Sequence, residues 1–169
     1  MGLDGKVLSD QASDIQAAAN ARTPVSKPEF EKIAAGHAVL VELVVTDASG
    51  ARVSSNVYWW SKDEAKLREL NALPQATLTT SASVAASGSE RKATVQIKNA
   101  GSAPALMIKL TLKDAASGER ILPAYYSENY VSLLPGEERT VTIEFPAGQT
   151  KPAVGLRAWN LNQETIDVK

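Results

Sequence analysis

Three of the chain's four tyrosines, Tyr125, Tyr126 and Tyr130, lie close together, although its other aromatic residues are only three Trp and two Phe. Glu128 and Asn129 stand between them, and a carboxylate and an amide can both hydrogen-bond sugar hydroxyls. Aromatic rings present a flat apolar face with a polar tip, which suits a sugar ring. The same residue types also fill the interior of a folded domain, so the spacing leaves both interpretations open.

A second aromatic cluster consists of Tyr58, Trp59 and Trp60. Neighbouring residues of a strand face opposite sides, so Trp59 and Trp60 cannot both belong to the core of one sheet. An outward aromatic residue can pack against a neighbouring domain, contact a sugar or stand at the surface without a role. Of these alternatives we favour domain packing.

The chain has 19 carboxylate side chains, which raises the question of glycoside hydrolysis. That reaction needs two carboxyl groups facing each other across a sugar. Here the carboxylates stand mostly in turns or on the outward faces of expected strands, as with Glu119, Glu137, Glu138 and Glu144. We interpret them as solvated surface charge and assign no catalytic residue.

The remaining chemistry is sparse. The only histidine, His37, follows Gly36 at the start of an expected strand, and the chain has no cysteine. No nucleophile elbow, calcium loop or glycine-rich phosphate loop is present. We therefore predict no catalytic triad, no metal site and no cofactor.

The composition of the chain excludes further classes of function. The chain of 169 residues is 44% hydrophobic and 22% charged, with a net charge of −1. It has no apolar run long enough for a membrane helix, and neither half forms a basic surface. We expect neither a membrane nor a nucleic acid as partner, while the first six residues show no secretory signal and leave the compartment open.

The elements that would position these residues show a hydrophobic period of two, which is typical of strands with one buried face. The segment 106–112 has this pattern, and four other runs share it, each bounded by turn residues. Seven or eight short strands over residues 77–169 predict a complete immunoglobulin-like antiparallel β-sandwich. The five runs are Leu106/Ile108/Leu110/Leu112, Leu78/Thr80/Ala82/Val84, Ala93/Val95/Ile97, Val141/Ile143/Phe145 and Val154/Leu156/Ala158.

The first part of the chain predicts fewer strands. Residues 39–60 read as a hairpin with a turn at 47–50, and weaker strand patterns occur around 6–8, 15–19 and 30–33. These are too few for a full sandwich of about 100 residues. We expect residues 1–61 to be the C-terminal part of a second sandwich, truncated and preceding the complete one, whose open sheet edges favour weaker order or self-association.

Two segments of the chain share a turn sequence. TDASGARV begins its turn at Asp47, and KDAASGERI begins its turn at Asp114. We interpret the likeness as a common hairpin turn and not as a duplicated domain, since one short match is weak evidence for a repeat.

Residues 62–76 are expected to form a linker with a short helix. Ser61 and Glu64 have the spacing of a capping box, Leu67 and Leu70 repeat at helical spacing, and Pro74 ends the run. The predicted architecture is therefore a partial β-sandwich, a linker helix and a complete β-sandwich at 77–169.

Several segments together resemble the C-terminal region of large glycoside hydrolase family 2 enzymes, in the branch of exo-β-D-glucosaminidases, β-mannosidases and mannosylglycoprotein endo-β-mannosidases. In that branch the penultimate immunoglobulin-like domain ends in an Asn-x-Tyr-Trp-x-Ser strand, which matches 56–61, and a Leu-Pro linker follows, which matches 73–74. The last domain carries a Leu-Pro-x-x-Tyr-Ser-(Asp/Glu)-Asn-Tyr-x-Ser-Leu-Leu-Pro-Gly-Glu run, which matches 122–137. Val57 and Trp60 depart from the common pattern.

The resemblance covers roughly residues 38–168 and implies a retaining hydrolase whose catalytic glutamates lie on a (β/α)₈ barrel, the acid/base within an Asn-Glu pair. This chain has no Asn-Glu dipeptide and no room for a barrel of about 250 residues. The resemblance thus implies a non-catalytic accessory region that packs on the barrel of a periplasmic or secreted parent enzyme and walls its substrate pocket.

The residues expected to contact an oligosaccharide or the neighbouring barrel are Tyr125, Tyr126, Glu128, Asn129, Tyr130, Trp59 and Trp60. One alternative is a self-sufficient carbohydrate-binding module that uses exposed tyrosine and tryptophan. A second alternative is an adhesion or scaffold sandwich without a link to carbohydrate.

Overall fold

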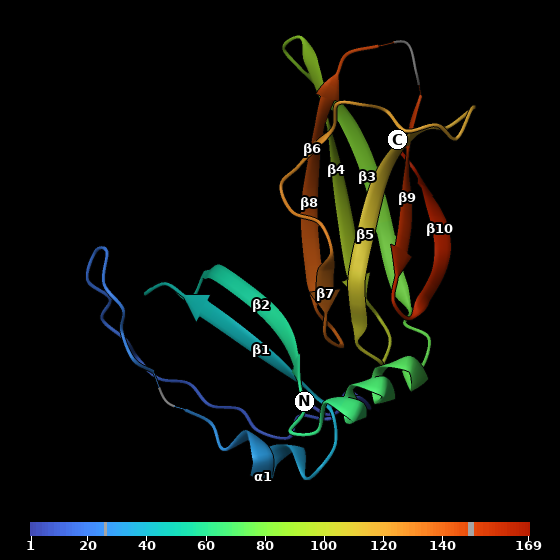
Figure 1. Cartoon of the computed structure of the whole chain (residues 1–169). Helices are drawn as coiled ribbons and strands as arrows, with labels where there is room; N and C mark the ends of the chain where they lie inside the picture. Colours follow the sequence, from blue (N-terminus) through green and yellow to red (C-terminus); the bar gives the residue numbers. More distant parts are fainter. Residues whose placement is uncertain (26, 149–150) are drawn as a thin grey trace. The chain divides into compact units, whose positions relative to one another are not determined.

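The computed structural model describes residues 1–25, 27–148 and 151–169. The chain divides into two compact units, Met1–Ala72 and Leu73–Lys169. Both units contain antiparallel sheets, strands dominate the second unit, and the predicted all-β class is confirmed (Figure 1).

The second unit is a sandwich of two four-stranded sheets (Figure 1). One sheet has the order β3-β4-β8-β6 and the other the order β10-β9-β5-β7. All paired strands within them run antiparallel. The strands are β3 Leu78–Ser87, β4 Glu90–Asn99, β5 Ala105–Asp114, β6 Tyr125–Tyr126, β7 Val131–Leu133, β8 Glu138–Pro146, β9 Pro152–Ala158 and β10 Leu161–Asp167.

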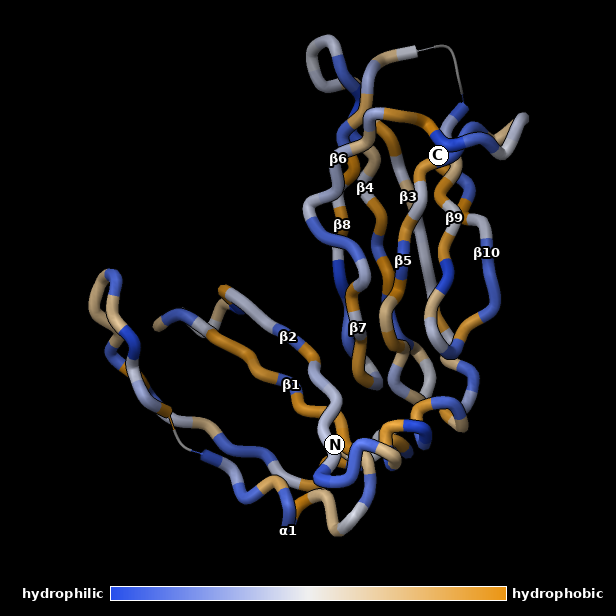
Figure 2. Tube along the Cα trace, in the orientation of Figure 1, coloured by the Kyte–Doolittle hydropathy of each residue, from blue (hydrophilic) through white to orange (hydrophobic). Residues whose placement is uncertain are grey.

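The core lies between these two sheets. Hydrophobic and hydrophilic residues alternate along β4 and β8 (Figure 2), and the hydrophobic ones are buried in one cluster shared by both sheets. The five predicted strand runs correspond to β5, β3, β4, β8 and β9. Fully buried members of the core include Val95, Ile97, Ile108, Leu110, Leu112, Leu133, Val141, Ile143, Phe145 and Leu156.

One detail of the predicted alternation is wrong. The sequence places Leu106 on the same face as Ile108, but the register with β7 shifts between Ala105 and Ile108. Met107 takes a positive φ of 56° there, which is the geometry of a β-bulge. Because of the extra residue, Ala105 joins the core cluster with Ile108, and Leu106 is buried outside that cluster.

The two Asp turns share one construction. Asp47 Oδ1 accepts hydrogen bonds from the Ser49 amide at 2.8 Å and the Ser49 hydroxyl at 2.6 Å. Asp114 Oδ1 likewise accepts the Ser117 amide at 2.7 Å and the Ser117 hydroxyl at 3.0 Å. These are Asx-type turns, which explains the repeated sequence as a shared turn.

The Asp114 turn gives a prediction about pH. The Ser117 amide and hydroxyl bond the charged carboxylate and thereby lower the pKa of Asp114. A lowered pKa in the folded state stabilises the fold above the unfolded pKa, and this contribution disappears as the pH falls through the folded value. NMR titration of the Asp114 carboxyl carbon should give a midpoint below 3.8, and Ser117→Ala should move it upward; an unchanged midpoint would contradict this assignment.

The first unit holds a single two-stranded sheet in its described part, formed by β1 Val39–Thr46 and β2 Arg52–Trp60, together with the helix α1 Phe30–Ala34 and the 3₁₀ helix η1 Glu64–Ala72. The strands expected around 6–8, 15–19 and 30–33 are wrong, because the first two segments are irregular and the third is helical. In α1 the apolar residues Phe30 and Ile33 stand three apart, which is helical spacing.

The far end of this hairpin is exposed and apolar. Leu43, Val44 and Val45 of β1 and Val53 of β2 are all solvent-exposed, and β1 is hydrophobic along most of its length (Figure 2). A two-stranded sheet cannot bury its own faces. These apolar side chains therefore remain open to solvent within the first unit.

A helix does follow the hairpin, as predicted, but the predicted capping box is absent. The Asp63 carboxylate accepts the Ala65 amide at 2.9 Å and takes the place of the expected cap. The Ser61 hydroxyl is buried and finds no hydrogen-bond partner among the described residues. Asp is as good an N-terminal cap as Ser, and here it stands closer to the helix start.

Candidate functional site

Tyr126 is a structural residue. Its ring packs against the core cluster, and its hydroxyl accepts a hydrogen bond from the Leu112 amide at 2.8 Å. The apolar ring thus packs against the core, while the hydroxyl bonds the backbone of β5.

Asn129 binds the same edge of β5 at Leu110, two residues before Leu112. Its Oδ1 accepts the Leu110 amide at 2.8 Å and its Nδ2 donates to the Leu110 carbonyl at 3.0 Å. Strand β7 pairs with β5 only at Ala105 and Ile108, so no strand covers the next part of that edge. The side chains of Asn129 and Tyr126 occupy the backbone groups that a longer strand would have paired.

The residues between them attach the segment to the other sheet. The Ser127 amide donates to the Thr142 carbonyl at 2.9 Å, and the Ser127 hydroxyl accepts the Thr142 amide at 3.0 Å. Glu128 forms an ion pair with Arg139, with oxygen–nitrogen distances of 3.1 and 3.3 Å. Glu128, predicted as a sugar or interdomain contact, therefore already serves as the counter-ion of Arg139.

Two tyrosines of the segment remain at the surface. Tyr125 is 65% exposed and Tyr130 is 49% exposed. Tyr130 takes a positive φ of 58°, and the Lys109 ammonium lies 5.2 Å from its ring centroid. A hydrogen bond from Lys109, with the charges of Lys109, Arg157 and Arg120, lowers the pKa of the Tyr130 phenol.

The two tryptophans differ in their surroundings. The Trp60 ring lies 5.5 Å from the Phe30 ring, centroid to centroid, and is half-buried, whereas Trp59 is 41% exposed. The prediction that adjacent aromatics cannot share one core therefore holds. Both tryptophans belong to the first unit, and the three clustered tyrosines belong to the second.

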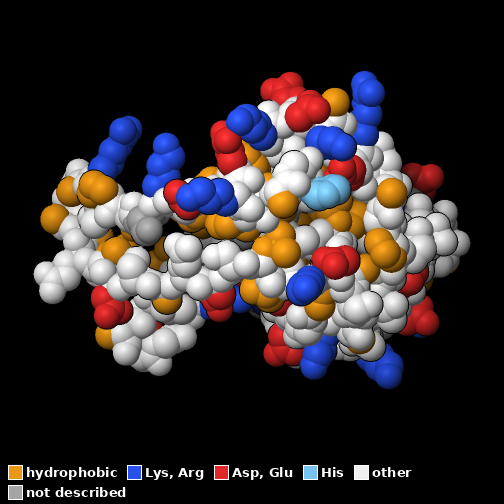
Figure 3. Space-filling view, turned by 90° about the horizontal axis from the view of Figure 1, so that it is seen from below, with side chains coloured by type: hydrophobic (Ala, Val, Ile, Leu, Met, Phe, Trp, Pro, Cys, Tyr) orange, Lys and Arg blue, Asp and Glu red, His pale blue; other side chains and the backbone are white. Residues whose placement is uncertain are grey.

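His37 is a surface residue with a structural partner. Its side chain is 70% exposed, and its Nδ1 lies 3.4 Å from Glu69 Oε1 (pale blue side chain in Figure 3). Glu69 Oε2 also accepts the Ala38 amide at 3.1 Å. The hydrogen bond from the Ala38 amide is the largest cause that lowers the pKa of Glu69, and the hydrogen bond with His37 lowers it further. The arrangement fastens η1 to the start of β1.

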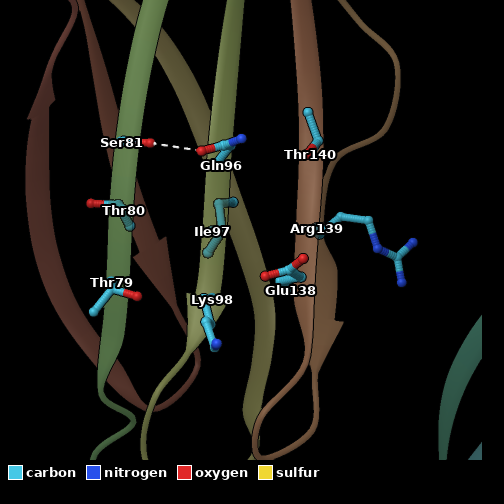
Figure 4. Close-up of a pocket in the computed structure, with 9 residues that line it drawn as sticks. All are labelled: Thr79, Thr80, Ser81, Gln96, Ile97, Lys98, Glu138, Arg139 and Thr140. Carbon is cyan, nitrogen blue, oxygen red and sulfur yellow. Dashed lines mark hydrogen bonds between the residues drawn. The ribbon is translucent and has the colours of Figure 1, made fainter.

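The outer face of β3, β4 and β8 carries a shallow polar hollow of about 330 Å³. Figure 4 shows Thr79, Ser81, Gln96, Lys98 and Glu138 along its floor, with a hydrogen bond of 3.2 Å between Ser81 and Gln96. Its lining has one carboxylate and no aromatic ring. This hollow lacks the stacking surface that sugar binding uses.

A larger hollow of about 560 Å³ lies on the outer face of the opposite sheet. Its lining includes four cationic side chains, Lys109, Lys113, Arg120 and Arg157, and one carboxylate, Glu119. The sequence did not predict this hollow, because its cationic residues come from β5, β9 and a loop that are separated along the chain. Only the outward lysines at alternate positions of β5 indicated a basic surface.

Neither hollow can hydrolyse a glycoside by the usual two-carboxylate route, since each lining contains one carboxylate. Two other acidic side chains already have partners: Glu144 is paired with Lys92 at 2.7 Å, and Glu137 accepts a hydrogen bond from the Leu134 amide.

Within residues 1–25, 27–148 and 151–169, no cluster of His, Asp and Glu fits a metal ion. No helix in this described part is long and apolar enough to span a membrane.

The second unit is an immunoglobulin-like antiparallel β-sandwich. A family model for the exo-β-D-glucosaminidase Ig-fold domain matches residues 56–161. The chain belongs to this family, which is part of glycoside hydrolase family 2.

Individual relatives agree with this family. The chain is 33% identical over 151 residues to an exo-β-D-glucosaminidase of Amycolatopsis orientalis, a match covering 75% of this chain and 14% of that protein. It is 38% identical over 90 residues to a mannosylglycoprotein endo-β-mannosidase of Lilium longiflorum, a match covering 48% of this chain and 9% of that protein.

The crystal structure of the Amycolatopsis orientalis exo-chitosanase CsxA superposes with a TM-score of 0.71 at 32% identity. This match covers 76% of the present chain and 18% of the CsxA chain. The chain thus spans less than a fifth of the length of these relatives.

Proposed function

We propose that the chain is a non-catalytic accessory region of a retaining glycoside hydrolase of the exo-β-glucosaminidase or β-mannosidase type. In this proposal the second unit packs on a (β/α)₈ catalytic barrel of the parent enzyme and helps to wall its substrate pocket. The observation that carries the proposal is the family match over residues 56–161, together with relatives that are much longer glycosidases.

The tyrosine segment supports this role. Its inner residues, Tyr126 and Asn129, hold the edge of β5, and Tyr125 and Tyr130 remain as exposed aromatics. Rigid aromatic side chains contribute large contact area at low entropic cost, as hot spots of protein contacts do. The proposed barrel or its bound sugar would contact these two rings.

The competing proposal is a self-sufficient carbohydrate-binding module, which the exposure of Tyr125, Tyr130 and Trp59 favours. The two functions differ in what the isolated chain does. A wall that needs the barrel leaves the sugar exposed on its other sides, and so should have little affinity alone.

We predict that the isolated chain neither hydrolyses p-nitrophenyl β-D-glucosaminide nor binds glucosamine or mannose oligomers at millimolar concentration. The test is an NMR titration of labelled chain that follows the amides of residues 125–134 and 58–61, with Tyr125→Ala as the matched variant. Saturable shifts that disappear in Tyr125→Ala would replace the accessory role with the binding module. Hydrolysis would refute both.

A further inference from the structure

The charges on the outer faces of the two sandwich sheets are arranged in opposite ways. On β4 and β8, Lys92 stands opposite Glu144 and Lys98 opposite Glu138. On the other sheet, Lys109 of β5 stands directly opposite Arg157 of β9. An isolated antiparallel β-bridge of the backbone likewise places Lys113 opposite Arg120. Opposite charges across strands stabilise a sheet and like charges destabilise it. The second sheet therefore carries two unfavourable pairs that the first avoids.

Nothing in the described residues neutralises these pairs by direct contact. Lys109, Lys113, Arg120 and Arg157 form no ion pair with a carboxylate within 4.0 Å in residues 1–25, 27–148 and 151–169. Glu119 lines the same hollow without making such a contact. A local rule that is broken without compensation often marks a functional surface.

The hollow also orders one of its cations. A Cβ at Gly155 would lie 3.1 Å from Cε and 3.3 Å from Nζ of Lys113. The absence of a side chain at Gly155 thus lets Lys113 lie flat across β9. Gly155 is buried, and the Lys113 side chain that lies over it lines the hollow.

We propose that this hollow binds a carboxylate-bearing oligosaccharide, such as a uronic acid oligomer, through Lys109, Lys113, Arg120 and Arg157. Guanidinium and ammonium groups are the natural donors to a sugar carboxylate. Glu119 and Gln163 in the lining supply acceptors for sugar hydroxyls, and Leu122 supplies apolar surface. The volume of about 560 Å³ falls in the usual range for ligand sites.

The aromatic residue at the edge of the hollow favours a sugar over a simple anion. Tyr130 is 49% exposed and carries the Lys109 ammonium 5.2 Å from its ring centroid. Since Lys109 lies over one face of this ring, a pyranose would stack on the other face while its carboxylate meets the cations. This binding goes beyond the accessory role proposed above, which concerns the neutral or amino sugars of the active site.

The test is an NMR titration of the full chain with oligogalacturonate, and separately with mannose oligomers, inorganic phosphate and poly-L-glutamate. We expect saturable shifts with oligogalacturonate at the amides of Lys109, Lys113 and Arg157, weakened by added salt. Arg157→Gln and Lys113→Gln should each weaken binding about tenfold, because each removes a charged hydrogen-bond donor. Since each relieves a like-charge pair, neither should lower the Tm.

Lys92→Gln and Lys98→Gln on the opposite sheet are the charge-matched controls and should leave binding unchanged. Equal loss in these controls would reduce the effect to net charge and refute the site. No shift with oligogalacturonate would refute it directly. Equally tight binding of phosphate would show a general anion site, and equally tight binding of poly-L-glutamate a peptide site; either outcome would overturn the glycan assignment. None of these results bears on the accessory role, which the glucosamine titration tests.

Discussion

Asn129→Ala is expected to lower the free energy of unfolding of the second unit by about 2–4 kcal/mol, because it removes both partners of Leu110. The Leu110 amide and carbonyl each bond the Asn129 side chain, at 2.8 and 3.0 Å, where β7 no longer covers β5. A backbone group left unsatisfied in the protein costs about 1–3 kcal/mol. Chemical denaturation followed by circular dichroism would measure the change.

The matched control for this variant is Tyr125→Ala in the same segment. Tyr125 is 65% exposed, and surface substitutions of this kind change stability by about 0.5 kcal/mol or less. Equal effects of the two variants would mean that Asn129 does not hold the strand edge, and would remove the structural interpretation of the tyrosine segment.

Phe145→Ala is expected to cost about 3–5 kcal/mol, the usual range for deleting a buried aromatic ring. Phe145 of β8 is 1% exposed and belongs to the core cluster shared by the two sheets. The guanidinium of Arg91 lies 5.5 Å from its ring centroid and adds a cation–π contact that would also be lost.

Thermal unfolding monitored at the β4 and β8 amides by NMR would measure this effect on the second unit alone. Leu122→Ala serves as control, since it also deletes an apolar side chain but from a position 72% exposed. A Phe145→Ala variant as stable as Leu122→Ala would contradict the assignment of the core.

Five strands of the second unit, β3, β4, β5, β8 and β9, could be predicted because apolar residues recur at alternate positions along them, and a period of two follows from strand geometry. The β-bulge at Met107 could not, since nothing in the residue types of Leu106–Ile108 signals a positive φ. In the first unit the strand prediction around 30–33 failed because a short apolar run fits a strand and a helix alike. The predictions around 6–8 and 15–19 failed because so short a pattern also occurs in irregular segments, as it does here.

The candidate site could be predicted only in part. Residue types identified the segment containing Tyr126 and Asn129, but not which side chains turn inward to β5 and which remain outside. That division depends on where β7 ends, which is a tertiary property. The basic hollow depends on Lys109 meeting Arg157 across strands that lie far apart in the sequence, and a single sequence does not show that register.

Tyr126 and Asn129 of the tyrosine segment act as structural residues that hold the edge of β5. Hydrogen exchange of the Leu110 and Leu112 amides tests this role most directly, because both bond only side chains of this segment in the structure. We predict protection equal to that of neighbouring ladder amides of β5 and β9, with Leu112 alone exchanging faster in Tyr126→Phe. Rapid exchange of both amides in the unmodified chain, or an unchanged Leu112 rate in Tyr126→Phe, would contradict the account.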